Sequence, residues 1–386
     1  MAIDKNNPMF PGFDVKSSPV DVELEQPTAT DPSNVTFDEE GGAIIDFNPS
    51  GSMAHGSAEF TRNLVEDMDE GELAHLSSEL VGQYESDKES RSDWEQTYIK
   101  GLDLLGFKME DRSQPFQGAS GVSHPLLAES VTQFQAQAYK ELLPAGGPVR
   151  TQVMGEETDA TTEQSERVKE FMNYQIIHVM EEFDPELDQM LFYLPLSGSA
   201  FKKVYYDQNL QRAVSKFIPS DELVVPYLAT NLDSCERVTH VVKMMGNDLR
   251  KHQVSGFYKD VELEPYQLDE KDLKEAQRKL EGTQKTTGSM EQHQLLEFHV
   301  LLDLPGFEDT DEKNKDTGIK LPYIVTIDED SGQILGIRRN WREDDELKSK
   351  IPYFVHYKFL PGLGFYGFGL IHMLGGLSKT ATSALR

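Results

Sequence analysis

The sequence predicts a mixed α+β fold in which helices come first and antiparallel strands follow. Two observations support this. Residues 59–196 carry apolar side chains at helical spacing, and the apolar period changes to two over residues 197–360. The 386 residues suffice for about two domains. We therefore expect a disordered acidic arm over residues 1–58, a helical region over 59–196, a β-rich region over 197–360, and a glycine turn with a final helix over 361–386.

The arm is rich in Pro, Gly, Ser, Asn and acidic residues, as in "QPTATDPSN" and "NPSGSMAHGS". Such a composition cannot bury enough apolar surface to offset the entropy of the chain, so disorder is predicted. A docking tail and a solvated tail without a task remain equally open.

Helix signals recur through the helical region. Residues 58–105 show a helical pattern with breaks near Gly71 and Ser86, and a capping serine, Ser92, starts its last segment. Further helices are predicted over residues 123–142, over 162–182, directly after Asp184-Pro185, and over 269–280.

Strand signals dominate after Ser197. The run "SAFKKVYYDQNLQRAVSKFI" predicts a hairpin. Five more strands are predicted in "RVTHVVKMM", "QLLEFHVLLDL", "LPYIVTID", "QILGIRRNW" and "PYFVHYKFL".

The charge balance argues against a protein that grips nucleic acid. The formal net charge is −30, and residues 1–90 alone hold 20 acidic and 4 basic side chains. A chain this acidic is a poor candidate for neutralising phosphates, which needs clusters of Lys and Arg. Cys235 is the only cysteine, so disulfide frameworks and cysteine-based zinc sites are excluded and a reducing compartment is expected.

A glycine pattern, G-x-G-x-x-G, lies between a predicted strand and a predicted helix at Gly362, Gly364 and Gly367. This context is the one a dinucleotide-binding loop requires. However, Phe365 and Tyr366 crowd the turn where a pyrophosphate would approach, and no βαβ unit follows. Nucleotide binding is therefore a minor alternative, and no cofactor is expected.

The same segment raises the question of a membrane span. Residues 359–377 carry no formal charge and approach spanning length, but six of these residues are glycine and two more are Pro361 and His372. We therefore expect no membrane partner. A mechanical role remains: a glycine turn that leads into a helix with an apolar stripe at Leu370, Leu374, Leu377, Ala381 and Leu385.

Signals for metal or catalytic chemistry are weak. In "DTDEKNKDTG", Lys313 stands where a calcium loop needs an oxygen ligand, and Asn314 replaces its glycine. The ten histidines form neither H-x-H nor H-E-x-x-H. We therefore expect no metal site, no catalytic residues and no enzymatic activity.

One long region of the sequence resembles a known family. The runs "ESDKESRSDWEQTYIKGLDLLGF", "QPFQGASGVSHPLLAESVTQFQAQAYKELLPAGGPVRTQV", "FMNYQIIHVMEEFDPELDQMLFYLPLSGSAFKKVYYD" and "LPGLGFYGFGLIHMLGGLSKTATSALR" are similar to portal proteins of tailed bacteriophages, also called head-to-tail connectors. The resemblance extends from about Asp87 to Arg386. Family members continue beyond the final helix, so the resemblance implies an N-terminal fragment that ends inside a long helix.

The resemblance implies a structural subunit rather than an enzyme. Family members form a dodecameric ring at one capsid vertex of the virion, assembled in the host cytoplasm, for genome packaging and ejection. The implied partners are further copies of the chain, the large terminase subunit, the major capsid and scaffolding proteins, tail or adaptor proteins, and double-stranded DNA that passes through without sequence-specific binding. Residues 59–360 would then form the wing, and 361–386 would begin the stem or channel-side helix.

On this reading the glycine turn is a hinge or close-packing joint between the β-rich wing and the final helix. Glycine permits close backbone approach, and Phe365, Tyr366 and Phe368 are expected to anchor a neighbouring subunit. Lys379 and Arg386 are the candidate channel-facing cations. The alternatives are an acidic adaptor protein that docks partners through its tail and, less favoured, a nucleotide-binding enzyme that uses residues 362–367.

Overall fold

A computed structural model of the chain confirms the α+β class. It describes residues 59–107, 116–117, 120–207, 210–264, 272–282, 292–310 and 315–386, and, within the predicted arm, the short strands β1 (Val35–Phe37) and β2 (Ala43–Ile45), which pair antiparallel. The remainder of the predicted arm and the "DEKN" part of the calcium-like stretch lie outside the described residues.

The described residues form eight α-helices and two short helical turns. These are the 3-10 turn η1 (Leu64–Asp67), α1 (Glu70–Ser90), α2 (Ser92–Asp103), α3 (Leu126–Leu142), α4 (Asp159–Tyr174), the π-helical turn η2 (Gln175–Val179), α5 (Phe183–Ser197), α6 (Gly246–Val254), α7 (Asp272–Glu281) and α8 (Leu370–Leu385).

Several predicted helix boundaries were wrong. The predicted break near Gly71 is confirmed, because η1 ends at Asp67 and α1 begins at Glu70, where Asp69 accepts a hydrogen bond from Gly71 N. The predicted break near Ser86 is wrong, because Ser86 lies inside α1. The break falls at Arg91, and Arg91 rather than Ser92 is the N-terminal flanking residue of α2. The sequence pattern also missed α6 entirely.

Two antiparallel sheets carry the remaining strands. One has the order β10-β3-β4 and the other the order β5-β6-β7-β8-β9. Their bounds are β3 (Ser199–Asp207), β4 (Arg212–Pro219), β5 (Leu223–Val224), β6 (Arg237–Met245), β7 (Gln292–Leu302), β8 (Leu321–Asp328), β9 (Ile334–Arg339) and β10 (Phe354–Lys358). The predicted hairpin and all five further strands are confirmed.

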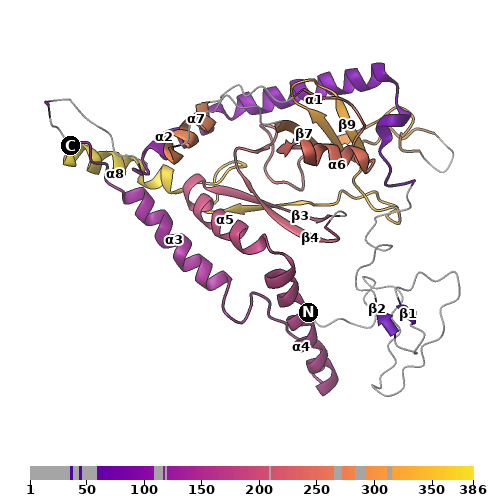
Figure 1. Cartoon of the computed structure of the whole chain (residues 1–386), viewed down its shortest axis with the longest axis horizontal. Coiled ribbons are helices and arrows are strands. Elements are labelled where there is room, and N and C mark those ends of the chain that lie inside the picture. The colour runs from indigo at the N-terminus through magenta and orange to yellow at the C-terminus, as the bar shows by residue number, and fades with distance from the viewer. Residues whose placement is uncertain are drawn as a thin grey trace. The chain divides into compact units, whose positions relative to one another are not determined.

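The described body divides into two compact units, each built from several stretches of sequence. The first unit contains Lys140–Pro185 and Tyr205–Ser215, and the second contains 59–139, Glu186–Val204 and Lys216–Arg386. In the second unit α1 lies along one face of the five-stranded sheet (Figure 1), where Leu80 and Tyr84 pack on Phe298 and its neighbours.

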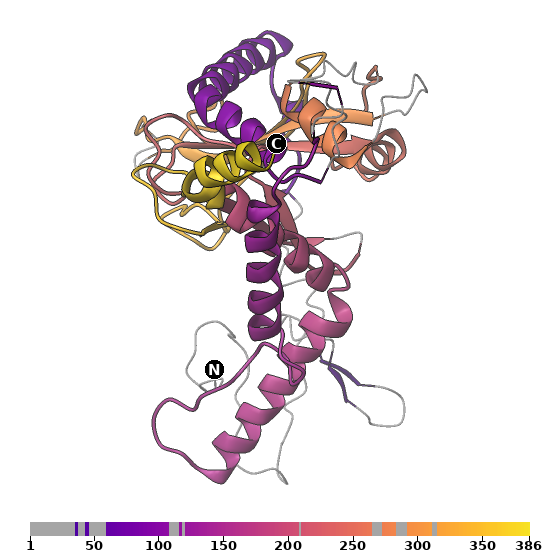
Figure 2. The ribbon, with the colours of Figure 1, turned by 90° about the vertical axis from the view of Figure 1, so that its left-hand side faces the viewer.

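A second core of this unit joins its helices. Residues of α2, α3 and α8, with Leu196 at the end of α5, form one apolar cluster. Figure 2 shows α8 beside α2, in agreement with their contacts. This cluster fixes the C-terminal helix to the body that carries the sheets.

Candidate assembly joint at the glycine turn

The glycine turn before α8 packs backbone against backbone. A Cβ atom on Gly367 would lie 2.4 Å from the carbonyl oxygen of Gly198, and one on Gly369 would lie 2.3 Å from that of Leu196. Gly198 itself has φ +89° and would place a Cβ 2.4 Å from the oxygen of Gly367. Only glycine fits at these positions, so the turn and the junction between α5 and β3 interlock.

The other two glycines of the pattern differ from each other. A Cβ atom on Gly362 would lie 2.4 Å from the oxygen of Tyr366, whereas one on Gly364 would meet nothing within 4 Å. Close packing therefore explains why glycine occupies positions 362 and 367, but it does not explain glycine at position 364.

Two backbone donors at the end of the turn are used within the chain. Gly367 N donates to Ser199 Oγ at 2.8 Å, and Phe368 N donates to Leu360 O at 2.9 Å. A phosphate-binding loop presents such N–H groups to its ligand. The described geometry thus favours a structural joint over the minor nucleotide-binding alternative.

Two of the three aromatic side chains of the turn pack inside their own chain. Phe365 is buried, and its ring lies 5.9 Å from that of Phe201 and 4.7 Å from that of His356. Tyr366 stacks on Trp94 with ring centroids 4.8 Å apart. These two residues were expected to anchor a neighbouring subunit, but their rings are engaged with the body that carries them.

Phe368 retains an exposed surface beside His372 at the start of α8. Leu363, at the tip of the turn, is fully exposed. These two side chains are therefore the apolar groups that the turn offers to another molecule.

His356 contributes a neutral ring to the packing. Burial, together with the nearby Lys358 ammonium, lowers the pKa of His356 to about 4. Its Nε2 atom lies 3.1 Å from Ser199 Oγ, the same oxygen that accepts from Gly367 N. At neutral pH the uncharged imidazole suits this apolar setting beside Phe365.

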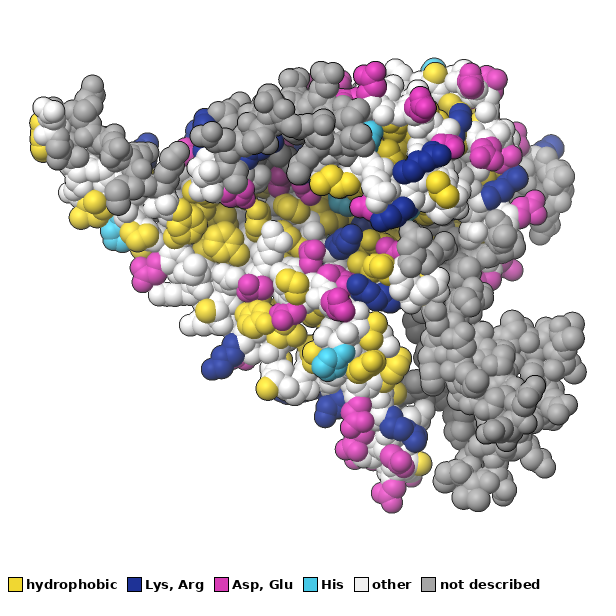
Figure 3. Space-filling view, viewed as in Figure 1, with side chains coloured by type: hydrophobic (Ala, Val, Ile, Leu, Met, Phe, Trp, Pro, Cys, Tyr) yellow, Lys and Arg dark blue, Asp and Glu magenta, His cyan; other side chains and the backbone are white. Residues whose placement is uncertain are grey.

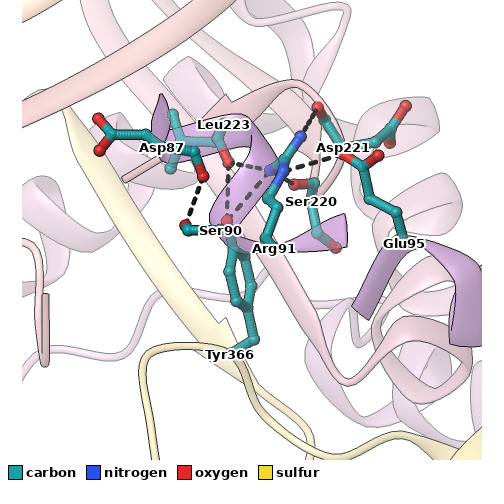
Figure 4. A network of polar contacts seen from close by, with 8 residues as sticks. All are labelled: Asp87, Ser90, Arg91, Glu95, Ser220, Asp221, Leu223 and Tyr366. Carbon is teal, nitrogen blue, oxygen red and sulfur yellow. Dashed lines mark hydrogen bonds and ion pairs between the residues drawn. The ribbon is translucent and has the colours of Figure 1, made fainter. Parts of the chain in front are cut away.

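A buried arginine ties the turn to the corner between α1 and α2 (Figure 4). Arg91 Nη1 donates to Ser220 O at 3.0 Å, to Leu223 O at 2.8 Å and to the Tyr366 hydroxyl at 3.1 Å. Nη2 donates to Asp221 O at 2.6 Å. A planar guanidinium with five donors suits such a set of diverging acceptors.

Charge balance keeps this cation protonated. Burial alone lowers the pKa of Arg91, but the Tyr366 oxygen, Glu95 and Asp221 outweigh it, so that the pKa is raised. Glu95 Oε1 accepts from Arg91 Nε at 3.0 Å, which supplies the opposite charge that a buried guanidinium needs.

Glycines at the contact between α8 and α2 allow the two helices to approach closely. A Cβ atom on Gly101 of α2 would lie 2.3 Å from Ile371 Cδ1, and one on Gly375 would lie 3.4 Å from Leu104 Cδ1. The helix therefore buries Leu370, Ile371, Gly375 and Ser378. The predicted stripe is wrong in part, because Leu377 and Leu385 are exposed.

The two candidate channel-facing cations differ in their surroundings. Lys379 lies exposed on α8. Arg386 is partly buried, with Nε donating to Val122 O and Nη2 to Ser123 Oγ, both at 2.9 Å. The guanidinium of Arg386 thus fixes the end of α8 to the segment before α3.

Sequence reasoning missed Arg91, Gly101 and Gly198. The glycine in "LSGSAF" marks a helix-to-strand junction, which is the one signal that pointed to Gly198. Nothing in the local sequence distinguishes Arg91 from an exposed arginine between helices.

Among the described residues, no three His, Cys, Asp or Glu side chains gather as a metal-binding group, and no helix is at once long and apolar enough to cross a bilayer. Comparison with models of known protein families gives no match, and neither does comparison with curated proteins.

Proposed function

We propose that this chain is a subunit of a bacteriophage portal, a ring at one capsid vertex through which DNA enters and leaves. One observation carries the proposal: one side of α8 is packed within the second unit, while large apolar side chains on its other side are exposed. Met373 and Leu377 on α8 are 54% and 60% exposed, and Leu363 on the preceding turn is 102% exposed.

An apolar surface on a firmly seated helix is suited to protein–protein contact. Contiguous exposed apolar side chains mark interaction surfaces in soluble proteins, whereas scattered ones need no explanation. Because backbone interlocking at Gly198 and Gly367 holds α8 in place, this surface would lose little conformational freedom on binding. A ring subunit needs such a preformed surface.

The charge of the chain fits a conduit for DNA. A formal net charge of −30 opposes retention of a duplex that carries about one phosphate charge per 1.7 Å of axis. DNA would thus move past the ring without being held. Lys379 remains a candidate for centring the duplex, since it is exposed on α8.

The partners follow from the resemblance to portal proteins. They are further copies of this chain in a dodecameric ring, the large terminase subunit, the major capsid and scaffolding proteins, and tail or adaptor proteins. The place of action would be the portal vertex of the virion.

Oligomeric state tests the proposal. The purified chain is examined by size-exclusion chromatography with light scattering and by negative-stain electron microscopy, and closed rings are expected. Leu363→Asp combined with Met373→Glu is expected to release monomers. The matched control is Leu347→Asp, because Leu347 is also a strongly exposed leucine and lies on the loop between β9 and β10. A chain that stays monomeric at all concentrations contradicts the proposal and favours the acidic adaptor alternative.

A further inference from the structure

The outer edge of β10 has no strand beside it. β10 stands at one end of the sheet order β10-β3-β4, and its neighbour in that sheet is β3. Phe359 N, directly after β10, donates to Gly198 O at 3.0 Å, so the odd-numbered residues direct their backbone groups toward β3. Three residues direct their backbone groups outward, where no described residue pairs with them: Phe354, His356 and Lys358.

The outer edges of β4 and β9, in contrast, are bonded to other parts of the chain. On β4, Phe217 N donates to the Glu186 carboxylate at 2.6 Å. On β9, Ile337 N donates to Asn63 Oδ1 and Asn63 Nδ2 donates to Leu335 O, both at 2.9 Å. Proteins cover edge strands because an open edge pairs readily with another chain. The open edge of β10 is therefore a place where an extended segment can add as a further strand.

β10 presents apolar side chains on one face and a lysine on the other. Val355 and Tyr357 are 45% and 37% exposed. Because side chains alternate along a strand, Lys358 lies on the opposite face, with its Nζ atom 3.5 Å from Gly364 O. Lys358 is the one charged residue of β10 at neutral pH. Figure 3 shows acidic side chains spread over the viewed face of the molecule, whereas an acidic segment beside β10 would meet a cation.

One segment of the acidic arm has a pattern that complements this edge. Residues 20–25 read "VDVELE", in which apolar and acidic residues alternate strictly. This period of two is typical of a strand with one apolar face and one charged face. Beside β10, the segment would place its apolar residues next to Val355 and Tyr357, and its carboxylates on the face of Lys358.

We propose that residues 20–25 of one copy add as an antiparallel strand to the outer edge of β10 in the next copy. β10 leads into the glycine turn, and the exposed Leu363 of that turn belongs to the surface assigned above to contact between copies. The open edge is thus continuous with that surface, which favours the arm of the neighbouring copy as its occupant.

The length of the arm permits such an exchange. Residues 26–58 connect the segment to the body, and an extended chain spans about 3.3 Å per residue, which gives a reach on the order of 100 Å. The inference rests on the proposed ring, for which it supplies a second contact. A closed ring requires two different patches of the same chain to meet, and the arm and the edge are two such patches.

Disulfide trapping in the full chain tests the docking. Cys235 is the only cysteine, so a Cys235→Ala background carries no thiol. Val22→Cys and Tyr357→Cys are introduced into separate, differently tagged copies that are co-expressed and oxidised. With Asp21 opposite Lys358, the two thiols face each other at a non-hydrogen-bonded position, where Cα atoms lie about 4.5 Å apart and a disulfide can form. Each copy holds one thiol, so a covalent dimer with both tags reports contact between copies.

The matched control moves one thiol by a single residue. Glu23→Cys with Tyr357→Cys places the thiols on opposite faces of the sheet, so we expect a yield of mixed-tag dimers at least about tenfold lower than for Val22→Cys. Leu24→Cys with Val355→Cys tests the same register at a second position, and it covers the case in which Tyr357→Cys does not fold. We expect mixed-tag dimers for this pair as well.

Two outcomes would overturn the docking itself. Equal yields for Val22→Cys and Glu23→Cys would show that the arm meets β10 without pairing as a strand. A disulfide that forms only when Val22→Cys and Tyr357→Cys are combined in one chain would show that the arm docks within its own copy.

The same samples separate failure of the inference from failure of the proposed function. Oligomers of the unsubstituted chain in light scattering, with no mixed-tag dimers for either pair of variants, would overturn the arm docking while the ring proposal stands. If the unsubstituted chain forms no oligomer, the ring proposal fails and the docking between copies fails with it.

Discussion

Lys203 on β3 and Glu297 on β7 form a bidentate ion pair that joins the two sheets. Lys203 Nζ lies 2.5 Å from Oε1 and 2.7 Å from Oε2 of Glu297, and both side chains are largely buried. His299 Nε2 lies 2.6 Å from the same Oε1 atom. His240, on β6, is the cross-strand partner of Glu297, so four titratable groups meet between the sheets.

Removal of one charge from this pair is expected to destabilise the fold strongly. Glu297→Gln leaves the buried Lys203 ammonium without its counter-charge, which costs about 3–5 kcal/mol in comparable pairs. The double variant Lys203→Met, Glu297→Gln removes both charges and is expected to recover most of that loss. Urea denaturation followed by circular dichroism measures both, and equal losses in the single and double variants would contradict the expected coupling.

The same cluster predicts a loss of stability in acid. Burial, reinforced by the Lys203 charge, lowers the pKa of His240 to about 3, so the unfolded chain binds this proton more readily than the folded one. The contribution of neutral His240 to the free energy of unfolding is complete above the ordinary pKa of 6.5. It declines as the pH falls toward 3, by about 1.4 kcal/mol per pH unit.

Glu297 and His299 also make the folded state less stable as the pH falls. Lys203 and His299 hold the pKa of the Glu297 carboxyl well below its ordinary value despite burial, and burial lowers the pKa of His299. Denaturation midpoints measured from pH 7 to pH 4 should therefore fall, and His240→Leu should flatten the decline. The control is His178→Leu, because His178 is exposed in the first unit. An unchanged slope in His240→Leu would refute the assignment.

The fold class and most strands could be predicted from the sequence, because the runs of apolar and β-branched residues in β6, β7 and β8 are local signals. The buried side of α8 could not. Large apolar residues predicted a stripe through Leu377, but the buried side of the helix continues through Gly375 and Ser378. Gly375 lies against Leu104 at the end of α2, and Ser378 Oγ donates to His124 O before α3. Periodicity of large residues misses an interface that small residues create.

Only the part of the joint whose residues are neighbours in the sequence could be predicted. The glycine turn indicated a close-packing joint at Gly367, and the structure places the Gly198 backbone against it. The identity of that partner depends on contact between segments 169 positions apart, which no local pattern records. The role of Arg91 could not be predicted for the same reason, because the backbone oxygens that accept its hydrogen bonds lie about 130 residues away.

Gly367→Ala is expected to loosen the joint. Its Cβ would lie 2.4 Å from Gly198 O and 2.8 Å from Leu360 O, and backbone atoms cannot move aside as a flexible side chain can. Overpacking of this kind typically costs about 1–3 kcal/mol. Gly364→Ala is the matched control, because that Cβ meets open space. Thermal unfolding compares the two, and equal midpoints would show that close packing at Gly367 does not stabilise the joint.

Arg91→Lys tests whether the guanidinium itself holds the turn to the corner of α1 and α2. A lysine keeps the charge but has one nitrogen, so most of the acceptors now served by Nη1, Nη2 and Nε would be buried without a donor. Each such group costs about 1–3 kcal/mol, so a loss above about 3 kcal/mol is expected in urea denaturation. Tyr366→Phe removes a single partner and should cost about 1 kcal/mol. Arg167→Lys, at an exposed arginine, is the control. If Arg91→Lys unfolds at the same urea concentration as that control, the network in Figure 4 does not carry the stability assigned to it.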